Sequence, residues 1–397
     1  MSTLSRPFIA MTAVVGAAGC LFALPAAAAP LKIGLISTYS GAYADDGHQM
    51  DAGVKIYMQD HGDSAGGRTI QIIRRDETGS APNLVKRLAR ELVIDQKVDV
   101  LAGIVFSPNA LATAPVATQS KTPTVIMNAA TTSIITKSPY LVRTAFTVPQ
   151  LTAPLARWAS AHGIKSAYTV VPDYAPGYDA EKAFAAAFTK AGGQIVGKVR
   201  IPLSNADFSP YVQRIKDVKP QAIFLYMPTG QMPVGFIRTF NALGLAAEGI
   251  KVLGDAGTGD DQVVRLLGKD AVGTITSTNY WAGLDNPANK KFVAEYHKLY
   301  GANEEPNYFT VGAYDGMAAI YAAANKTKGQ MHDMAAIDAV KGLTIDSPRG
   351  PIEIDAKTRD IVQNIYIRRA EMVNGKIENV LIDTAARIDN NGDSLGK

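Results

Sequence analysis

The sequence of 397 residues is poor in the residues that perform chemistry. Its single cysteine, Cys20, lies in an N-terminal apolar segment, so the chain beyond it has no disulfide and no thiol chemistry. The histidines are scattered without the spacing of metal ligands, and the motif H-E-x-x-H and the Walker A loop are missing. An enzyme therefore remains only a remote alternative, and we expect no cofactor and no metal.

Charge is also scarce. The 40 basic and 36 acidic residues give a formal net charge of +4, and the basic residues form no long run. A protein that binds nucleic acid normally shows a basic stripe or patch, so we expect no nucleic-acid partner.

The N-terminus has the features of an export signal. Arg6 precedes an apolar stretch, and the alanines of Ala26–Ala29 fit a cleavage site of the A-x-A type, which predicts a signal peptide over residues 1–29. The alternative is a lipoprotein signal at "AAGC", with Cys20 carrying the lipid. Beyond residue 30, no apolar run approaches the roughly 18 residues that span a bilayer. The mature chain is expected to be periplasmic and unanchored.

From residue 31 onward, apolar strands alternate with helix-like stretches. "LKIGLIS", "RTIQIIRRD" and "DVLAGIV" are typical of strands, and "APNLVKRLARELVIDQKV" has the spacing of an amphipathic helix. The alternation starts afresh after Val148 with "SAYTVVPD" and "QAIFLYMP", and the tail contains a hairpin signal at Asn374-Gly375. This order predicts an α/β protein with two doubly wound parallel sheets, in which ligands bind at the carboxyl ends of strands.

One such strand end is "GIVFSPNALATAPV", residues 103–116. Serine is a good N-cap and proline suits a first helical turn, so the sequence predicts a helix capped by Ser107. The start of a helix presents free N–H groups and a positive dipole end, which suit a carboxylate. The alternative is an ordinary capped helix with no ligand.

The order and spacing of several segments make the chain similar to the periplasmic leucine/isoleucine/valine-binding proteins, the solute receptors of ABC importers. The segments are "LKIGLISTYSGAYADDGHQMDAGVKIYMQD", "NAATTSIITKSPYLVRTAF", "VPDYAPGYDAEKAF", "DFSPYVQRIKDVKPQAIFLY", "GFIRTFNALGL" and "YFTVGAYDGMAA". The resemblance implies two Rossmann-like lobes joined by three crossings of the chain. It places lobe 1 at residues 30–148 plus 279–357 and lobe 2 at residues 149–278 plus 358–397.

The resemblance also implies a ligand site between the lobes. A carboxylate would be held by Ser107 and by the loop of Ala129, Ala130 and Thr131. The other residues that the resemblance brings to the site come from both lobes: Tyr43, Phe106, Tyr174, Pro176, Tyr178, Thr229, Gln231, Asp255, Trp281 and Phe309. Core packing is the alternative role of the aromatic residues among them.

Three departures from the family's pattern bear on the ligand. No glutamate stands near Ala256, where the family binds an ammonium group, although Asp255 is adjacent. Pro176 aligns with a family tyrosine, and Phe106 replaces a cysteine of a family disulfide. These departures weaken an amino-acid ligand more than a carboxylate ligand, so a branched-chain or other amino acid and an aromatic acid both stay open.

The resemblance further implies a monomer that delivers its ligand to the permease subunits of an ABC importer in the inner membrane. A periplasmic receptor that reports the ligand to a signalling partner would have the same fold and is the alternative.

Overall fold

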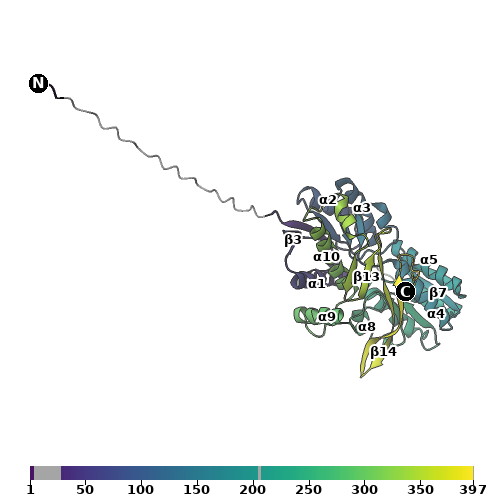
Figure 1. Ribbon diagram of the computed structural model, residues 1–397. Coiled ribbons are helices and arrows are strands. Elements are labelled where there is room, and N and C mark those ends of the chain that lie inside the picture. The colour runs from purple at the N-terminus through teal and green to yellow at the C-terminus, as the bar shows by residue number, and fades with distance from the viewer. Residues whose placement is uncertain (4–27, 204–206, 397) are drawn as a thin grey trace.

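The computed structural model describes residues 1–3, 28–203 and 207–396. Most of the predicted signal peptide, including Cys20, lies outside the described residues. From Leu31 onward, strands and helices alternate along nearly the whole chain and build two β-sheets flanked by helices (Figure 1). The predicted α/β class with two doubly wound, Rossmann-like sheets is confirmed.

The first sheet has six strands in the order β2-β3-β1-β4-β5-β6. All of its neighbours are parallel except β2 and β3. The strands are β1 (Leu31–Ser37), β2 (Ser64–Ala65), β3 (Arg68–Asp76), β4 (Val100–Gly103), β5 (Thr124–Ile126) and β6 (Leu141–Arg143). Strands β4, β5 and β6 are buried along their whole length, as expected for a parallel sheet covered on both faces.

The second sheet follows the order β12-β13-β14-β11-β10-β9-β7-β8, and β15 pairs with β14. Its parallel part is β7 to β11, and the later strands add to it in antiparallel fashion. The strands are β7 (Ser166–Pro172), β8 (Gln194–Ile201), β9 (Ala222–Leu225), β10 (Lys251–Gly254), β11 (Ile275–Thr278), β12 (Thr344–Ser347), β13 (Gly350–Ile354), β14 (Ile361–Val373) and β15 (Lys376–Ile388).

Helices cover the sheets. They are α1 (Ala44–His61), α2 (Pro82–Ile94), α3 (Ser107–Ser120), α4 (Val148–Ala161), α5 (Ala175–Lys190), α6 (Ser209–Val218), α7 (Gln231–Ala242), α8 (Asp261–Leu267), α9 (Pro287–Tyr300), α10 (Tyr308–Lys326) and α11 (Met334–Val340). Helix α1 packs tightly against α10, far away in the sequence. Gly53 lies at the crossing, because a Cβ atom there would stand 2.0 Å from the carbonyl oxygen of Thr310.

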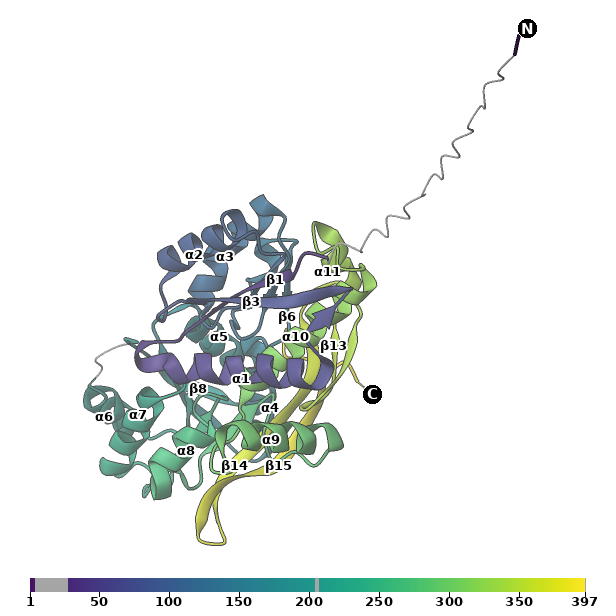
Figure 2. The same ribbon diagram turned by 90° about the vertical axis from the view of Figure 1, so that its left-hand side faces the viewer.

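The predicted hairpin in the tail is present. Strands β14 and β15 pair down to Val373 and Lys376, and Asn374 and Gly375 both have positive φ, 49° and 82°. Figure 2 shows the end of this hairpin projecting beyond the helices around it.

Two buried ion pairs tie together the segments that pass between the sheets. The guanidinium of Arg349 lies 2.7 Å from the Asp315 carboxylate and donates to the carbonyl oxygens of Thr144 and Ala145, just beyond β6. Its neighbour Gln363, on β14, accepts another of its hydrogen bonds. These bonds hold the end of the first sheet against the start of β14.

The second pair is formed by Arg143 and Asp360, 3.0 Å apart and nearly inaccessible to solvent. Arg143 also donates to the carbonyl oxygens of Phe146 and Thr131. A buried charge needs partners of this kind, because desolvation of an ion is expensive. The residues where the chain leaves the first sheet are therefore fixed by side chains from the later crossing. The lobe boundaries inferred from the resemblance remain a prediction.

Candidate functional site

A small, largely buried cavity lies where strand ends of the two sheets face each other. Its volume is about 50 Å³, room for only a few water molecules. Its wall is formed by residues that follow strands of both sheets and by the starts of α1 and α10. They are Asp46, Val105, Phe106, Ser107, Asn128, Ala130, Phe146, Tyr174, Pro176, Tyr226, Met227, Pro228, Thr229, Asp255, Gly257, Tyr308 and Phe309.

Three hydrogen bonds join elements of the first sheet's side to those of the second around this cavity. The Thr132 amide donates to Asp179 on α5 (3.0 Å), and the Asn307 amide group donates to Asp260 at the start of α8 (3.0 Å). The hydroxyls of Thr229 and Tyr308 are 2.5 Å apart. The two sides are thus in contact, and the cavity lies between them.

Ser107 lies on this wall, but it is not the N-cap that the sequence predicts. Phe106, with extended backbone (φ −96°, ψ 136°), is the N-cap residue, and Ser107 is the first residue of α3, followed by Pro108. The reason is a tertiary contact, since the Ser107 Oγ accepts hydrogen bonds from the amides of Ala130 (3.2 Å) and Thr131 (3.1 Å). Both lone pairs are engaged there, while the hydroxyl proton stays available to an acceptor in the cavity.

Beneath Ser107 lies a buried acid that sequence reasoning missed. The Glu77 carboxylate accepts hydrogen bonds from the Val105 amide (2.8 Å), the Asn109 side chain (2.8 Å) and the Thr38 hydroxyl (3.1 Å). Burial raises its pKa to about 7, although the hydrogen bonds from Asn109 and the backbone oppose the shift. Glu77 follows directly on β3, so its place at a strand end was the available signal. It fixes the turn that presents Ser107.

The loop after β5 lies beside Ser107. Asn128 donates to the Val105 carbonyl oxygen (2.9 Å), which joins the loop to the turn before α3. Ala129, Ala130 and Thr131 are all buried, but of these three only Ala130 lines the cavity.

Aromatic rings make up much of the remaining wall. Phe106, Tyr174 and Phe309 line the cavity, as the resemblance implies. Tyr43 stands behind Phe106, with the ring centroids 5.1 Å apart in an edge-to-face arrangement. Three further rings of the wall were missed by sequence reasoning, and they are those of Phe146, Tyr226 and Tyr308.

Two carboxyl groups contribute to the same wall. Asp255 follows β10 and accepts hydrogen bonds from the amide (3.1 Å) and hydroxyl (2.8 Å) of Thr258. Burial raises its pKa to about 6, against those hydrogen bonds. Asp46, in the first turn of α1, is also buried, and burial followed by the charge of Asp260 raises its pKa well above the usual value. The wall contains no Lys or Arg side chain.

Three residues inferred from the resemblance lie away from the cavity. Tyr178 is 40% exposed, donates its hydroxyl proton to Asp173 (2.6 Å) and is covered by Arg200. Gln231 is exposed at the start of α7, and Trp281 lines a separate surface pocket beside Arg265 and Lys376. The structure does not bring them together with Ser107.

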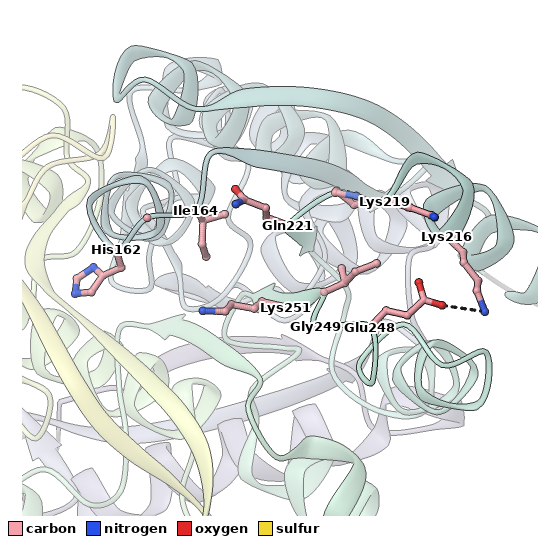
Figure 3. A pocket seen from close by; sticks show the side chains of 11 residues that line it. His162, Ile164, Lys216, Lys219, Gln221, Glu248, Gly249 and Lys251 are labelled. Carbon is pink, nitrogen blue, oxygen red and sulfur yellow. Dashed lines mark ion pairs between the residues drawn. The ribbon is translucent and has the colours of Figure 1, made fainter.

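A larger pocket of about 700 Å³ lies at the opposite end of the second sheet (Figure 3). Ile164, Gln221 and Lys251 line it from the amino ends of β7, β9 and β10, and an ion pair joins Lys216 to Glu248 (3.2 Å). Ligands of open α/β sheets bind at the carboxyl ends of the strands. The cavity that Ser107 lines has that location and is therefore the candidate site.

Other sites of chemistry are not supported in the described part of the chain. It contains no group of three or more metal-ligating side chains, and none of its helices is long and apolar enough to cross a membrane. The pattern Gly-x-Ser-x-Gly occurs at residues 62–66 and 392–396. In hydrolases this serine stands on a sharp strand-to-helix turn. Here Ser64 starts the two-residue strand β2, and Ser394 follows β15 near the C-terminus, so neither has that setting.

A family model described as periplasmic binding protein matches residues 30–376. The chain belongs to this family. It is also similar to Leu/Ile/Val-binding protein homolog 6 of Brucella melitensis, with 43% identity over 363 residues that cover 91% of this chain and 92% of the relative.

Two solved structures of Rhodopseudomonas palustris are similar over nearly their whole length. One is the solute-binding protein of an ABC transporter of strain BisB5 in complex with 3,4-dihydroxybenzoic acid (42% identity, TM-score 0.86, 91% of this chain and 98% of that one). The other, from strain HaA2, is in complex with p-hydroxybenzoic acid (39% identity, TM-score 0.89, 91% and 98%). The resemblance to the leucine/isoleucine/valine-binding proteins is confirmed, and this periplasmic binding protein has relatives that hold aromatic acids.

Proposed function

We propose that this periplasmic binding protein is the solute receptor of an ABC importer and that its ligand is a small aromatic carboxylate. The observation that carries the proposal is the composition of the wall of this cavity. One part of its wall is the start of α3 with Ser107, and much of the rest consists of aromatic rings. A carboxylate suits the first part and a planar ring suits the second.

The carboxylate would be held without a cation. Ser107 is the first helical residue, so its N–H has no acceptor within α3, and its hydroxyl proton is available as well. The amides of Ala130 and Thr131, which now donate to the Ser107 Oγ, stand in the same place. Hydrogen bonds to a charged acceptor inside a site shielded from water are the strong ones.

An amino acid is the second candidate, because Asp255 places a buried carboxyl group on the cavity wall that an ammonium group could meet. Asp255 is, however, already held by Thr258, and the two structural relatives described above hold acids without an amine. The aromatic acid is the better fit.

Capture requires the walls to part. The cavity of about 50 Å³ is smaller than the roughly 150 Å³ that an apolar cavity needs to admit benzene. The mechanism we propose is a hinge motion at the chain crossings, in which a ligand that contacts both sides favours the closed form. The closed form then docks on the permease in the inner membrane. Residues 1–29 direct export to the periplasm, and the protein acts as a monomer without catalysis. A receptor for a signalling partner is the alternative role.

Thermal melts of the chain from residue 30 test the ligand class. The panel holds benzoate, hydroxybenzoates, leucine, valine and phenylalanine. A ligand at a hundred times its dissociation constant stabilises the fold by about 2.7 kcal/mol, which is a readable shift of the melting temperature. The proposal expects a shift with the aromatic acids. A shift with the amino acids alone would refute it.

A further inference from the structure

Several buried carboxyl groups stand close to the cavity, and one of them has no hydrogen-bond partner among the described residues. Asp255 is held by Thr258, and Asp260 accepts hydrogen bonds from the Gln262 amide (2.9 Å) and the Asn307 side chain (3.0 Å). Asp46 is 5% exposed and lines the cavity, yet among the described residues neither a hydrogen bond nor an ion pair reaches its carboxyl group.

A carboxyl group that is removed from bulk water is destabilised unless a protein group, a bound water molecule or a ligand pairs with it. The nearby charges are of the same sign, since Asp260 and Asp45 both act to raise the pKa of Asp46. Nothing in the described protein offsets this arrangement. A partner that enters with the ligand would.

The surroundings of Asp46 indicate what kind of partner it is. Tyr308 lines the cavity together with Asp46, and Tyr43 directly precedes α1, the helix whose first turn holds Asp46. Phe106 and Phe309 stand against these two tyrosines, with ring centroids 5.1 Å and 4.4 Å apart. An aromatic ring that enters when the walls part can pack among them. A phenolic hydroxyl on that ring can donate to a carboxylate or accept from a carboxylic acid, so it pairs with either form of Asp46.

We propose that Asp46 binds a ring hydroxyl of the ligand and thereby makes the site selective for hydroxylated aromatic acids over unsubstituted or alkylated ones. The proposal rests on the proposed function, because it names the subclass of the same ligand. An ammonium group is the competing partner for this carboxyl group.

Calorimetric titration with ligands matched in size tests the assignment. We compare 4-hydroxybenzoate with 4-methylbenzoate, and the 3-substituted pair in the same way, because hydroxyl and methyl groups occupy nearly the same space. The wild-type chain is expected to prefer the hydroxyl form of at least one pair by about ten-fold or more, the value of one hydrogen bond to a charged group. In Asp46→Ala that preference is expected to vanish while the affinity for the methyl form is kept.

The matched control is Asp45→Ala, which removes the neighbouring acid of the same helical turn, whose side chain is exposed. It is expected to keep the preference. If Asp46→Ala does not fold, Asp46→Asn replaces it, and the preference must still fall because the hydrogen bond loses its charge.

The outcomes separate this inference from the proposed function. Binding of all four acids without preference for a hydroxyl, or a preference that survives in the Asp46 variants, overturns the role of Asp46 and leaves the proposed function standing. Binding of none of the acids, with leucine bound and lost in Asp46→Ala, overturns both and makes Asp46 an ammonium partner.

Discussion

Replacing Ser107 by alanine removes the group on which the carboxylate position is built. In the protein without ligand, the Oγ atom accepts two buried amides, those of Ala130 at 3.2 Å and Thr131 at 3.1 Å. Leaving a buried donor without a partner costs about 1–3 kcal/mol, so we expect the free energy of unfolding to fall by at least that much. In the complex, the loss of one hydrogen bond to a charged acceptor, about 1.5–3 kcal/mol, weakens binding about ten- to a hundred-fold.

Urea unfolding measures the first effect and calorimetric titration with benzoate or a hydroxybenzoate measures the second. Ser209→Ala is the matched control, because Ser209 also stands before a proline as the first residue of a helix, α6, but is exposed. It is expected to change neither quantity noticeably. If Ser107→Ala binds the acid as tightly as the wild type does, the reasoning that places the carboxylate at the start of α3 is refuted.

Two further predictions concern buried charges. Arg349→Met leaves the Asp315 carboxylate buried without its counter-ion. We expect the free energy of unfolding, measured with urea at neutral pH, to fall by about 3–5 kcal/mol. An unchanged value would contradict a stabilising role of the pair. Glu77 has a pKa of about 7 in the folded protein against a usual value of 4.5, so the folded form binds the proton more tightly than the unfolded chain. Its contribution therefore lowers the stability as the pH rises from about 4.5 to about 7, by roughly 3 kcal/mol in total. The free energy of unfolding, measured at several pH values in this range, should decrease less with rising pH in Glu77→Gln than in the wild type. Equal decreases would show that Glu77 is not the group that titrates.

Much of the fold was accessible from local patterns in the sequence. The segment "RTIQIIRRD" is strand β3 to the residue, and Asn374-Gly375 is the turn of the hairpin that the dipeptide predicts. Parallel strands buried on both faces and amphipathic helices leave strong periodic signals, so their order along the chain also identified the two sheets. The second sheet also contains strands from the C-terminal part of the chain, such as β14. Their place depends on pairing between segments far apart in the sequence, and no local pattern predicts it.

The site was predictable only in part, for the same physical reason. Ser107 and Phe106 could be predicted because they follow a strand end. The Ser107 hydroxyl does not cap the helix, because it accepts hydrogen bonds from a loop more than twenty residues away. Tyr226 and Tyr308 lie on different segments that meet only across the cavity. In the sequence, Asp46 is an ordinary acidic residue in the first turn of a predicted helix. Only the structure shows that it is buried without a partner among the described residues.

The contacts across the cavity have a kinetic consequence. The hydrogen bonds Thr132–Asp179 and Asn307–Asp260 join the two sides through residues that do not line the cavity, and both must break when the walls part. Each of them therefore slows the release of a bound ligand without contacting it. The lifetime of the complex can change through these four residues, and with it the speed of delivery to a membrane partner, while the side chains that contact the ligand stay the same.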